Sequence, residues 1–298
     1  MKALLFSESG DLASQLLTLL RDKFEINAYI LSKDDISEYG ASNVFQIETS
    51  FPYADNLSSF ISEEFKKWNY HVILMVSSPL TRDIAGMLSE ILKTEAITEI
   101  MKLETGENNK FYTERFFFGG KTIIREESDA RIFTFLAGLT DPQKVNTKSN
   151  VQKIRIDLKS RVSLVNEIEK PKSSVNLEKA DIIVSAGRGI GKKEGLSVIQ
   201  QLADVLHGEV GGSRPVCLDY HWLSEERQVG LSGKRVKPKI YIAAGISGQV
   251  QHIAGMRGSK TVIAINKDKN APIFNECDYG IVGDLYVVIP KLIEKLKK

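Results

Sequence analysis

The sequence predicts an α/β protein of two domains, each built on a mainly parallel sheet with flanking helices, the second of them doubly wound. Three observations predict this class. Short apolar strand-like runs alternate with amphipathic helical patterns in both halves, as in βαβ units. The length of 298 residues fits two domains of ordinary size. A hydrophobic fraction of 42% and only 22 Gly and 8 Pro residues are typical of a globular chain.

The first part of the chain alternates strands with helices. Apolar residues recur at helical spacing over Ser9–Leu20 and again from Phe60 to Trp68. The intervening apolar runs are short enough to be strands buried in a parallel sheet. These strands are expected at Ala3–Phe6, Ile26–Leu31, Val44–Ile47 and His71–Val76.

From about Lys110 the pattern changes to runs rich in aromatic and β-branched residues. Strands are expected at Phe111–Phe118, Thr122–Arg125 and Arg131–Phe135, with Gly119-Gly120 as the turn between the first two.

Two polar stretches follow these strands. Residues Thr140–Asn150 end the region, and Glu169–Ser174 has the composition of a linker. We therefore place the domain boundary near Lys170, which gives an N-terminal domain of residues 1–170 and a second domain of residues 171–298.

The second half returns to alternating strands and helices. The predicted strands are Ala180–Ser185, Lys239–Ala244, Thr261–Asn266 and Asp278–Val282. The predicted helices are Gly195–Leu206, Gln249–Met256 and Leu285–Leu296.

Composition excludes several classes of protein. A formal net charge of +2 is too small for a dedicated nucleic-acid binder. The apolar runs are far shorter than the roughly 20 residues of a membrane span, and the N-terminus lacks the pattern of a signal peptide, so we expect a cytoplasmic protein. Cys217 and Cys277 are too far apart to form a zinc motif or a disulfide scaffold.

The loop Ser185–Gly191 (Ser-Ala-Gly-Arg-Gly-Ile-Gly) is the first candidate for chemistry. It is not a dinucleotide fingerprint, because Lys192 stands where the third glycine belongs, and Lys193 breaks the P-loop pattern. Glycine amides, a following helix and the charge of Arg188 nevertheless favour an anion such as phosphate. The alternative is an ordinary strand-to-helix turn with a solvated arginine.

Polar or glycine-rich residues follow most other strands of this half. Ser247 is expected to cap the helix that carries His252, and His252 could instead be a satisfied, half-buried histidine. Asp284 could cap the last helix or hold a ribose hydroxyl. The segments concerned are Gly211–Pro215, Gln228–Lys234, Gly245–His252, Thr261–Asp268 and Asp278–Leu285.

Loops at one end of a parallel sheet form the usual ligand crevice. These loops offer amide donors, hydroxyls, two arginines and one histidine, without a metal cluster, a nucleophile motif or paired carboxylates. The combination favours a site that holds an extended dinucleotide over a site that attacks a substrate.

Four segments of the second half carry a resemblance to a known family: Pro238–Ser259, Val262–Asp268, Ala271–Phe274 and Asp278–Asp284. In them the chain resembles the alpha subunit of electron transfer flavoprotein. The first half is similar to the family's N-terminal domain more faintly, in strand order and in Thr113–Gly120. The resemblance implies that the second domain binds FAD in an extended pose and that the first contributes a subunit interface.

The resemblance also implies which residues contact the cofactor, position by position. Arg188 would face it, and Ser213 and Arg214 would form a pair with the guanidinium near the flavin ring. A second loop would comprise Val229, Gly230, Leu231 and Ser232, with the Ser232 hydroxyl near flavin N5. A third would comprise Ser247, Gly248, Gln249, Val250, Gln251 and His252, with His252 near the C2 carbonyl. Towards the adenosine end would lie Asn266, Asp284 and Leu285.

Three of these residues are expected to tune the flavin: Arg214, Ser232 and His252. Because histidine titrates near neutral pH, the influence of His252 is expected to be greatest at acidic pH. The chain departs from the family at Leu231, where glutamine is common, and in the segment Val216–Trp222, which is one residue longer, so that Asp219 to Trp222 are not matched with the family.

The implied function is electron transfer without an organic substrate, in a heterodimer with a beta subunit. Electrons would come from flavin dehydrogenases, typically the acyl-CoA dehydrogenases of fatty acid beta-oxidation, and leave to a quinone oxidoreductase. Two alternatives stay open: a subunit of an electron-bifurcating complex, and an enzyme that uses NAD or another nucleotide on a related α/β domain.

Overall fold

The computed structural model describes residues 1–50, 52–120, 122–156, 159–166 and 176–297. The chain forms two compact units. The first comprises Met1–Phe118 and Thr122–Glu167, and the second comprises Gly119–Lys121 and Ile168–Lys298. The expected linker Glu169–Ser174, with the boundary near Lys170, lies outside the described residues.

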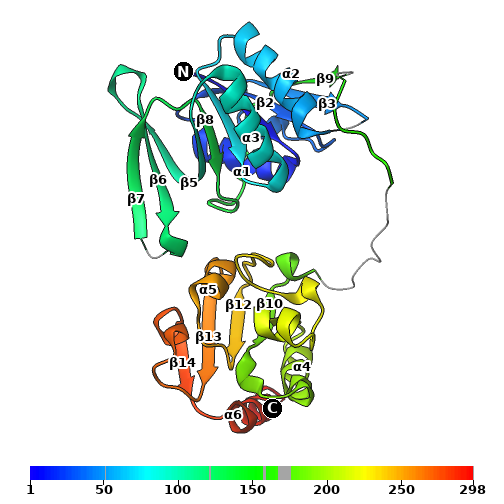
Figure 1. The fold of residues 1–298 in the computed structure, drawn as a ribbon, viewed down its shortest axis with the longest axis vertical. Coiled ribbons are helices and arrows are strands. Elements are labelled where there is room, and N and C mark those ends of the chain that lie inside the picture. Colours follow the sequence, from blue (N-terminus) through cyan, green and yellow to red (C-terminus); the bar gives the residue numbers. More distant parts are fainter. Residues whose placement is uncertain (51, 121, 157–158, 167–175, 298) are drawn as a thin grey trace. The chain divides into compact units, whose positions relative to one another are not determined.

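A nine-stranded sheet forms the centre of the first unit (Figure 1), in the order β7-β6-β5-β8-β4-β1-β2-β3-β9. All neighbours are parallel except β5–β6 and β6–β7, which are antiparallel. The strands are β1 Lys2–Ser7, β2 Glu25–Ile30, β3 Asn43–Glu48, β4 Val72–Val76, β5 Ala96–Thr105, β6 Phe111–Phe117, β7 Thr122–Ser128, β8 Ile132–Phe135 and β9 Asn150–Arg155.

Three helices cover the two faces of this sheet. Strand side chains alternate between the faces, so Leu5 packs in one core cluster and Leu4 in the other. Helix α1 (Gly10–Leu20) shares the cluster of Leu5, whereas α2 (Ala54–Lys67) and α3 (Pro79–Leu92) share the cluster of Leu4. Both faces are therefore buried at the central strands β8, β4, β1 and β2, as in α/β proteins.

The predicted α/β class is confirmed, and the strand–turn–strand prediction around Gly119-Gly120 is confirmed by the antiparallel pair β6–β7. Both glycines have positive φ (69° and 88°), a conformation that glycine adopts without steric cost. Helix α3 and strands β5 and β9 were not predicted.

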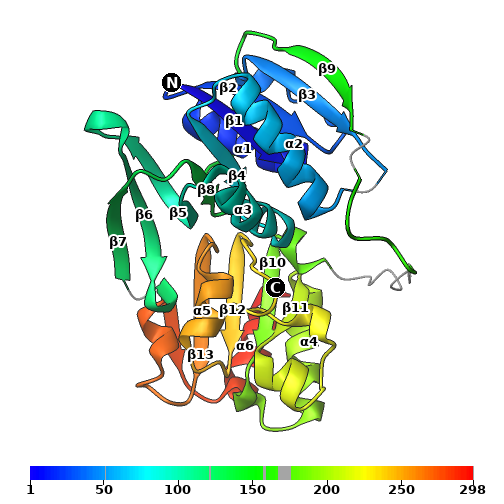
Figure 2. The same cartoon turned by 45° about the horizontal axis from the view of Figure 1, so that its top comes forward.

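The second unit contains a five-stranded, wholly parallel sheet in the order β11-β10-β12-β13-β14. Figure 2 shows β10, β12 and β13 side by side. The strands are β10 Ile182–Ala186, β11 Glu209–Gly212, β12 Ile240–Ala244, β13 Thr261–Asn266 and β14 Tyr279–Val282. The helices are α4 Leu196–Val205, α5 Val250–Met256 and α6 Leu285–Leu296.

The chain changes direction beside β10 in this sheet. It passes from β10 outwards to β11, then returns to the other side of β10 to form β12. Helices α4 and α6 pack on one face, in the cluster of Ile242, whereas α5 packs on the opposite face, in the cluster of Tyr241. In such a sheet the ligand crevice lies at the carboxyl ends of the strands where the order reverses, here β10 and β12.

The second unit also corrects one expectation from the sequence. Gly211 and Gly212, predicted to lie in a loop, form the end of strand β11 and pair with Ser185 and Ala186. No described helix is long and apolar enough to span a membrane.

Candidate functional site

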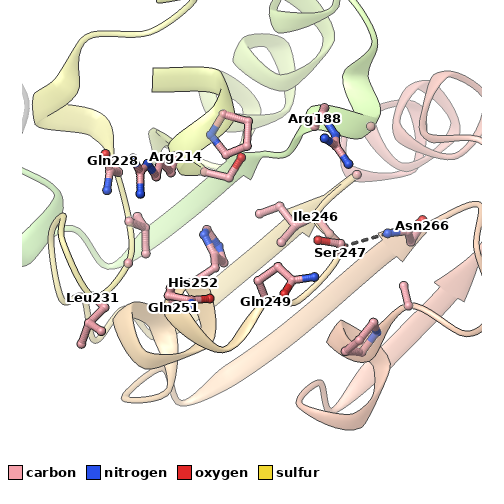
Figure 3. Close-up of a pocket in the computed structure, with 18 of the residues that line it drawn as sticks. Arg188, Arg214, Gln228, Leu231, Ile246, Ser247, Gln249, Gln251, His252 and Asn266 are labelled. Carbon is pink, nitrogen blue, oxygen red and sulfur yellow. Dashed lines mark hydrogen bonds between the residues drawn. The ribbon is translucent and has the colours of Figure 1, made fainter. Parts of the chain in front are cut away.

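A cavity of about 830 Å³ opens at the carboxyl ends of β10 and β12 (Figure 3). Its volume lies within the range usual for small-molecule sites. The lining residues are Arg188, Gly189, Ser213, Arg214, Pro215, Gln228, Val229, Gly230, Leu231, Ser232, Gly245, Ile246, Ser247, Gln249, Gln251, His252, Asn266, Asp268, Ala271 and Pro272.

The loops after β10 and β12 meet backbone to backbone. The amide of Gly187 donates to the carbonyl of Ala244 at 2.8 Å, and that of Gly189 donates to Gly245 at 2.9 Å. A Cβ atom on Gly187 would overlap the Gly245 carbonyl oxygen, so only glycine permits this approach. The contact fixes the floor of the cavity and places Arg188 on its wall.

Two arginines give the cavity a positive charge. Within the described residues, neither Arg188 nor Arg214 has an ion pair or a side-chain hydrogen bond, and both side chains are exposed. One carboxylate, Asp268, also lines the cavity, and it accepts a hydrogen bond from the amide of Asn270 at 2.9 Å. Two unpaired guanidinium groups beside glycine-rich backbone suit phosphate oxygens, which accept charge-assisted hydrogen bonds.

The loop from Gln228 to Lys234 forms a second wall. The Gln228 amide nitrogen donates to Ser232 Oγ at 3.0 Å, and the backbone of Leu231 donates to the Gln251 carbonyl at 2.7 Å. Leu231, which stands where the family commonly has glutamine, is half exposed. Gly230 lies against α5, where a Cβ on Gly255 would overlap its amide.

The predicted capping role of Ser247 is wrong. Helix α5 begins at Val250, its N-cap is Gln249, and no side chain caps it. The Ser247 carbonyl instead accepts from Ile273 at 3.1 Å, and a Cβ on Gly248 would overlap the amide of Ile273. The loop is therefore held by backbone contacts that spacing along the chain does not reveal.

His252 lies on α5, is 7% exposed, and its Nε2 is 2.9 Å from the hydroxyl of Tyr241. Burial lowers the pKa of His252 to about 4 and raises that of Tyr241. The imidazole is thus neutral at physiological pH, which corrects the expectation of a cation that forms at mildly acidic pH.

We expect the FAD-free chain to lose stability through His252 as the pH falls. In the unfolded chain the pKa of a histidine is near 6.5. Between that pH and about 4 the unfolded state therefore binds more protons than the folded state, and the free energy of unfolding falls as the pH falls. The full difference corresponds to about 3 kcal/mol. His252→Gln removes this contribution, and urea unfolding of the parent and the variant from pH 7 to pH 4 measures it.

Comparison of the two proteins is essential, because carboxyls whose pKa is lowered in the folded chain also cost stability on acidification. Glu126 beside Arg115 is one of them. An equal loss of unfolding free energy in the parent and in His252→Gln would contradict the assignment.

The residues expected towards the adenosine end separate into two groups. Asn266 lines the cavity and donates to the carbonyl of Ile246 at 2.8 Å (Figure 3). Asp284 caps α6 by accepting from the amide of Tyr286 at 2.9 Å, and it pairs with Lys267 at 3.0 Å. Leu285 is buried in the core of the second unit, and neither Asp284 nor Leu285 lines the cavity.

The structure brings most of the other predicted site residues together. The predicted residues that line the cavity are Arg188, Ser213, Arg214, Val229, Gly230, Leu231, Ser232, Ser247, Gln249, Gln251, His252 and Asn266. Gly248, in the loop before α5, and Val250, the first residue of α5, do not line the cavity. Sequence reasoning did not name eight lining residues, although each lies in one of the segments singled out from the sequence or in the Ala271–Phe274 motif. They are Gly189, Pro215, Gln228, Gly245, Ile246, Asp268, Ala271 and Pro272.

Several features test whether a flavin nucleotide fits this cavity. Several residues that line the cavity have a buried polar atom without a hydrogen-bond partner in the described chain, Ser213 Oγ and Gln228 Oε1 among them. Buried polar atoms are normally paired, so partners from a ligand are expected. Together with the arginines and the glycine backbone, these atoms suit a molecule with phosphates and a polar ring system. No group of three potential metal ligands occurs within the described ranges.

Comparisons with known proteins agree with this fit. Residues 176–257 match the model of the electron transfer flavoprotein FAD-binding domain, and residues 27–159 match that of the electron transfer flavoprotein domain. The alpha subunit of electron transfer flavoprotein from Thermoanaerobacterium thermosaccharolyticum is 40% identical over 283 residues, covering 91% of this chain and 85% of that protein.

Two further relatives cover similar spans. The alpha subunit from Bacillus subtilis is 35% identical over 272 residues, which are 89% of this chain and 83% of that protein. Protein FixB of Escherichia coli O157:H7 is 30% identical over 285 residues, which are 92% of this chain and 91% of that protein. The chain therefore belongs to the family of electron transfer flavoprotein alpha subunits, and its cofactor is FAD.

Proposed function

We propose that this chain is the FAD-carrying subunit of a heterodimeric electron carrier that acts on no organic substrate of its own. Electrons would enter from flavin dehydrogenases, such as acyl-CoA dehydrogenases, and leave to a quinone oxidoreductase. The observation that carries the proposal is the cavity at the end of β10 and β12. It combines two unpaired arginines with unpartnered polar atoms and holds no paired carboxylates or nucleophile–base pair within the described residues.

The chain's own residues would bind and orient the cofactor. The proposed contacts are the predicted residues that line the cavity, Arg188, Arg214 and Ser232 among them. Bound FAD would supply the capacity to take up and release electrons. The protein would set the affinity through charged hydrogen bonds and the redox potential through the charge and donors near the ring.

Arg188→Ala is expected to weaken FAD binding by about ten- to a hundredfold, because losing a hydrogen bond to a charged group costs about 1.5–3 kcal/mol. Equilibrium dialysis of FAD against the parent and the variant measures this. Lys193→Ala is the control, because it removes a charge five residues further along the chain, outside the cavity lining. Equal FAD affinity in Arg188→Ala and the parent would reject the role.

A second subunit is part of the proposal. Phe116, Phe117, Phe118 and Ile123 on the β6–β7 hairpin are 39%, 39%, 73% and 55% exposed, which is unusual for large apolar side chains gathered on one element. We assign this hairpin as a docking surface for the beta subunit. Co-purification from the native source tests the requirement, and a flavin-loaded monomer with full electron-transfer activity would refute it.

The function itself is tested on the FAD-loaded protein purified with its partner subunit. A flavin dehydrogenase and its substrate should bleach the flavin absorbance, and a quinone oxidoreductase should restore it. One flavin per complex fits the simple carrier, whereas two would favour the electron-bifurcating alternative. Turnover of NAD or another organic substrate by the protein alone would overturn the proposal in favour of an enzyme.

A further inference from the structure

Gln228 is buried at the base of the second wall of the cavity. It is 2% exposed, and its backbone is fixed at both ends: its amide donates to the Glu225 carbonyl at 2.9 Å, and its carbonyl accepts from the amide of Lys234 at 2.7 Å. A Cβ on Gly233 would lie 2.5 Å from the Gln228 carbonyl oxygen and 2.8 Å from its Cγ. The loop is thus closed tightly around this one side chain.

The side chain of Gln228 makes one hydrogen bond within the described residues, from its Nε2 to Ser232 Oγ at 3.0 Å. An amide nitrogen can donate but cannot accept. The Ser232 oxygen is therefore the acceptor, and its own proton must point elsewhere. Ser232 has no other hydrogen-bond partner in the described parts of the chain, and it lines the cavity.

Two features distinguish this arrangement from a structural hydrogen bond. Ser232 is an exposed residue, and a lone exposed hydroxyl rotates freely, whereas the buried amide restricts where its proton can go. In addition, Gln228 Oε1 is buried without a partner, although a purely structural glutamine normally has both ends satisfied inside the protein. Figure 3 shows Gln228 among the residues around the cavity.

We propose that Gln228 is a positioning residue: its amide fixes the Ser232 hydroxyl as a hydrogen-bond donor into the cavity, towards bound FAD. The inference rests on the proposed function. Gln228 would determine the direction in which the Ser232 hydroxyl donates. Neither the presence of a serine nor the size of the cavity determines that direction.

Gln228→Glu is the decisive variant, because it keeps the shape of the side chain and replaces the hydrogen-bond donor to Ser232 by an acceptor. A carboxylate accepts, so it would take the Ser232 proton away from the cavity. Gln249→Glu is the matched control, since Gln249 lines the same cavity and has no hydrogen bond to Ser232. Both variants introduce a carboxyl group into the cavity lining, and the quantity compared is the effect of Ser232→Ala within each background.

The experiment is a double-mutant cycle on the FAD-loaded full chain with its partner subunit, with Ser232→Ala as the second change. The readouts are the FAD dissociation constant and the midpoint potential of the saturated protein. We expect Ser232→Ala to weaken FAD binding about tenfold and to lower the potential in the parent and in Gln249→Glu. In Gln228→Glu, Ser232→Ala should change neither the dissociation constant nor the potential, because the Ser232 hydroxyl no longer donates into the cavity.

Additive effects of Ser232→Ala and Gln228→Glu would overturn the positioning role, and so would indistinguishable results for Gln228→Glu and Gln249→Glu. If Gln228→Glu does not fold, Gln228→Met replaces it: the Ser232 hydroxyl is then free to rotate, so the effect of Ser232→Ala should be smaller than in the parent, and an equal effect would overturn the positioning role. Failure of the proposed function is separate: it appears in the parent, as FAD-loaded protein that exchanges no electrons with its partners.

Discussion

Gly187→Ala is expected to abolish FAD retention and to destabilise the second unit. The new Cβ would overlap the carbonyl oxygen of Gly245, so the loops after β10 and β12 would have to separate. Overpacking usually costs about 1–3 kcal/mol, and here the obstacle is backbone, which no change of rotamer relieves. Two hydrogen bonds, Gly187 to Ala244 and Gly189 to Gly245, hold these loops together and would be strained.

The measurements are FAD content after gel filtration and the free energy of unfolding in urea. Gly191→Ala is the control from the same loop. Gly191 has a φ of 75° and nothing within 4 Å of its Cβ position, so this change costs about 1–3 kcal/mol of backbone strain but brings no steric overlap. Retention of FAD by Gly187→Ala at the parental level would show that the contact between the loops does not shape the site.

Comparison of the two variants distinguishes a loss of FAD binding caused by lower stability from a loss caused by a changed site. Gly191→Ala should bind FAD despite its lower stability, whereas Gly187→Ala should fail to bind even under conditions in which it is folded. That contrast follows from the position of Gly187 at the point where the strand order reverses, because the ligand crevice is built from the two loops that separate there.

Hydrophobic periodicity predicted most of the fold, and two of the strands it missed, β5 and β9, lack the local pattern by which a strand is recognised. Strand β5 contains a bulge between Ile97 and Ile100, with Glu99 at a φ of 57°, so its side chains lose the alternation by which a strand is recognised. Strand β9 is exposed along almost its whole length and forms only by pairing with β3, about a hundred residues earlier. Such pairing depends on tertiary structure and leaves little local signal.

The position of the site was predictable, but its internal contacts were not. Residues that follow parallel strands must gather at one edge of the sheet, and this placed Arg188, Arg214 and His252 on the same cavity. Spacing could not show that Ser247 is held by the backbone of Ile273, or that Tyr241 meets His252 inside the core. The charge state of His252 depends on that burial, so the sequence suggested a cation where the structure has a neutral ring.

Arg214→Ala is expected to lower the redox potential of bound FAD at every accessible pH, and His252→Ala to lower it less. Reduction adds negative charge to the flavin, which a nearby cation stabilises by the same physics that lowers the pKa of a carboxyl beside an arginine. Arg214 lines the cavity with no carboxylate partner in the described chain, and arginine stays protonated. A charged hydrogen bond of about 1.5–3 kcal/mol corresponds to a shift of about 60–130 mV per electron.

The pH dependence distinguishes the two residues. In the FAD-free chain burial holds the pKa of His252 at about 4. We expect the ring to stay neutral from pH 6 to pH 8 with FAD bound, so its removal should give the same small shift throughout that range. Arg214→Lys is the control, since it keeps the charge and should retain most of the potential. The alternative is that both side chains only hold the loops in shape, in which case FAD binds more weakly but the potentials of the saturated variants do not change. Spectroelectrochemical titration of FAD-saturated protein separates these outcomes, and unshifted midpoints in Arg214→Ala would end the tuning hypothesis.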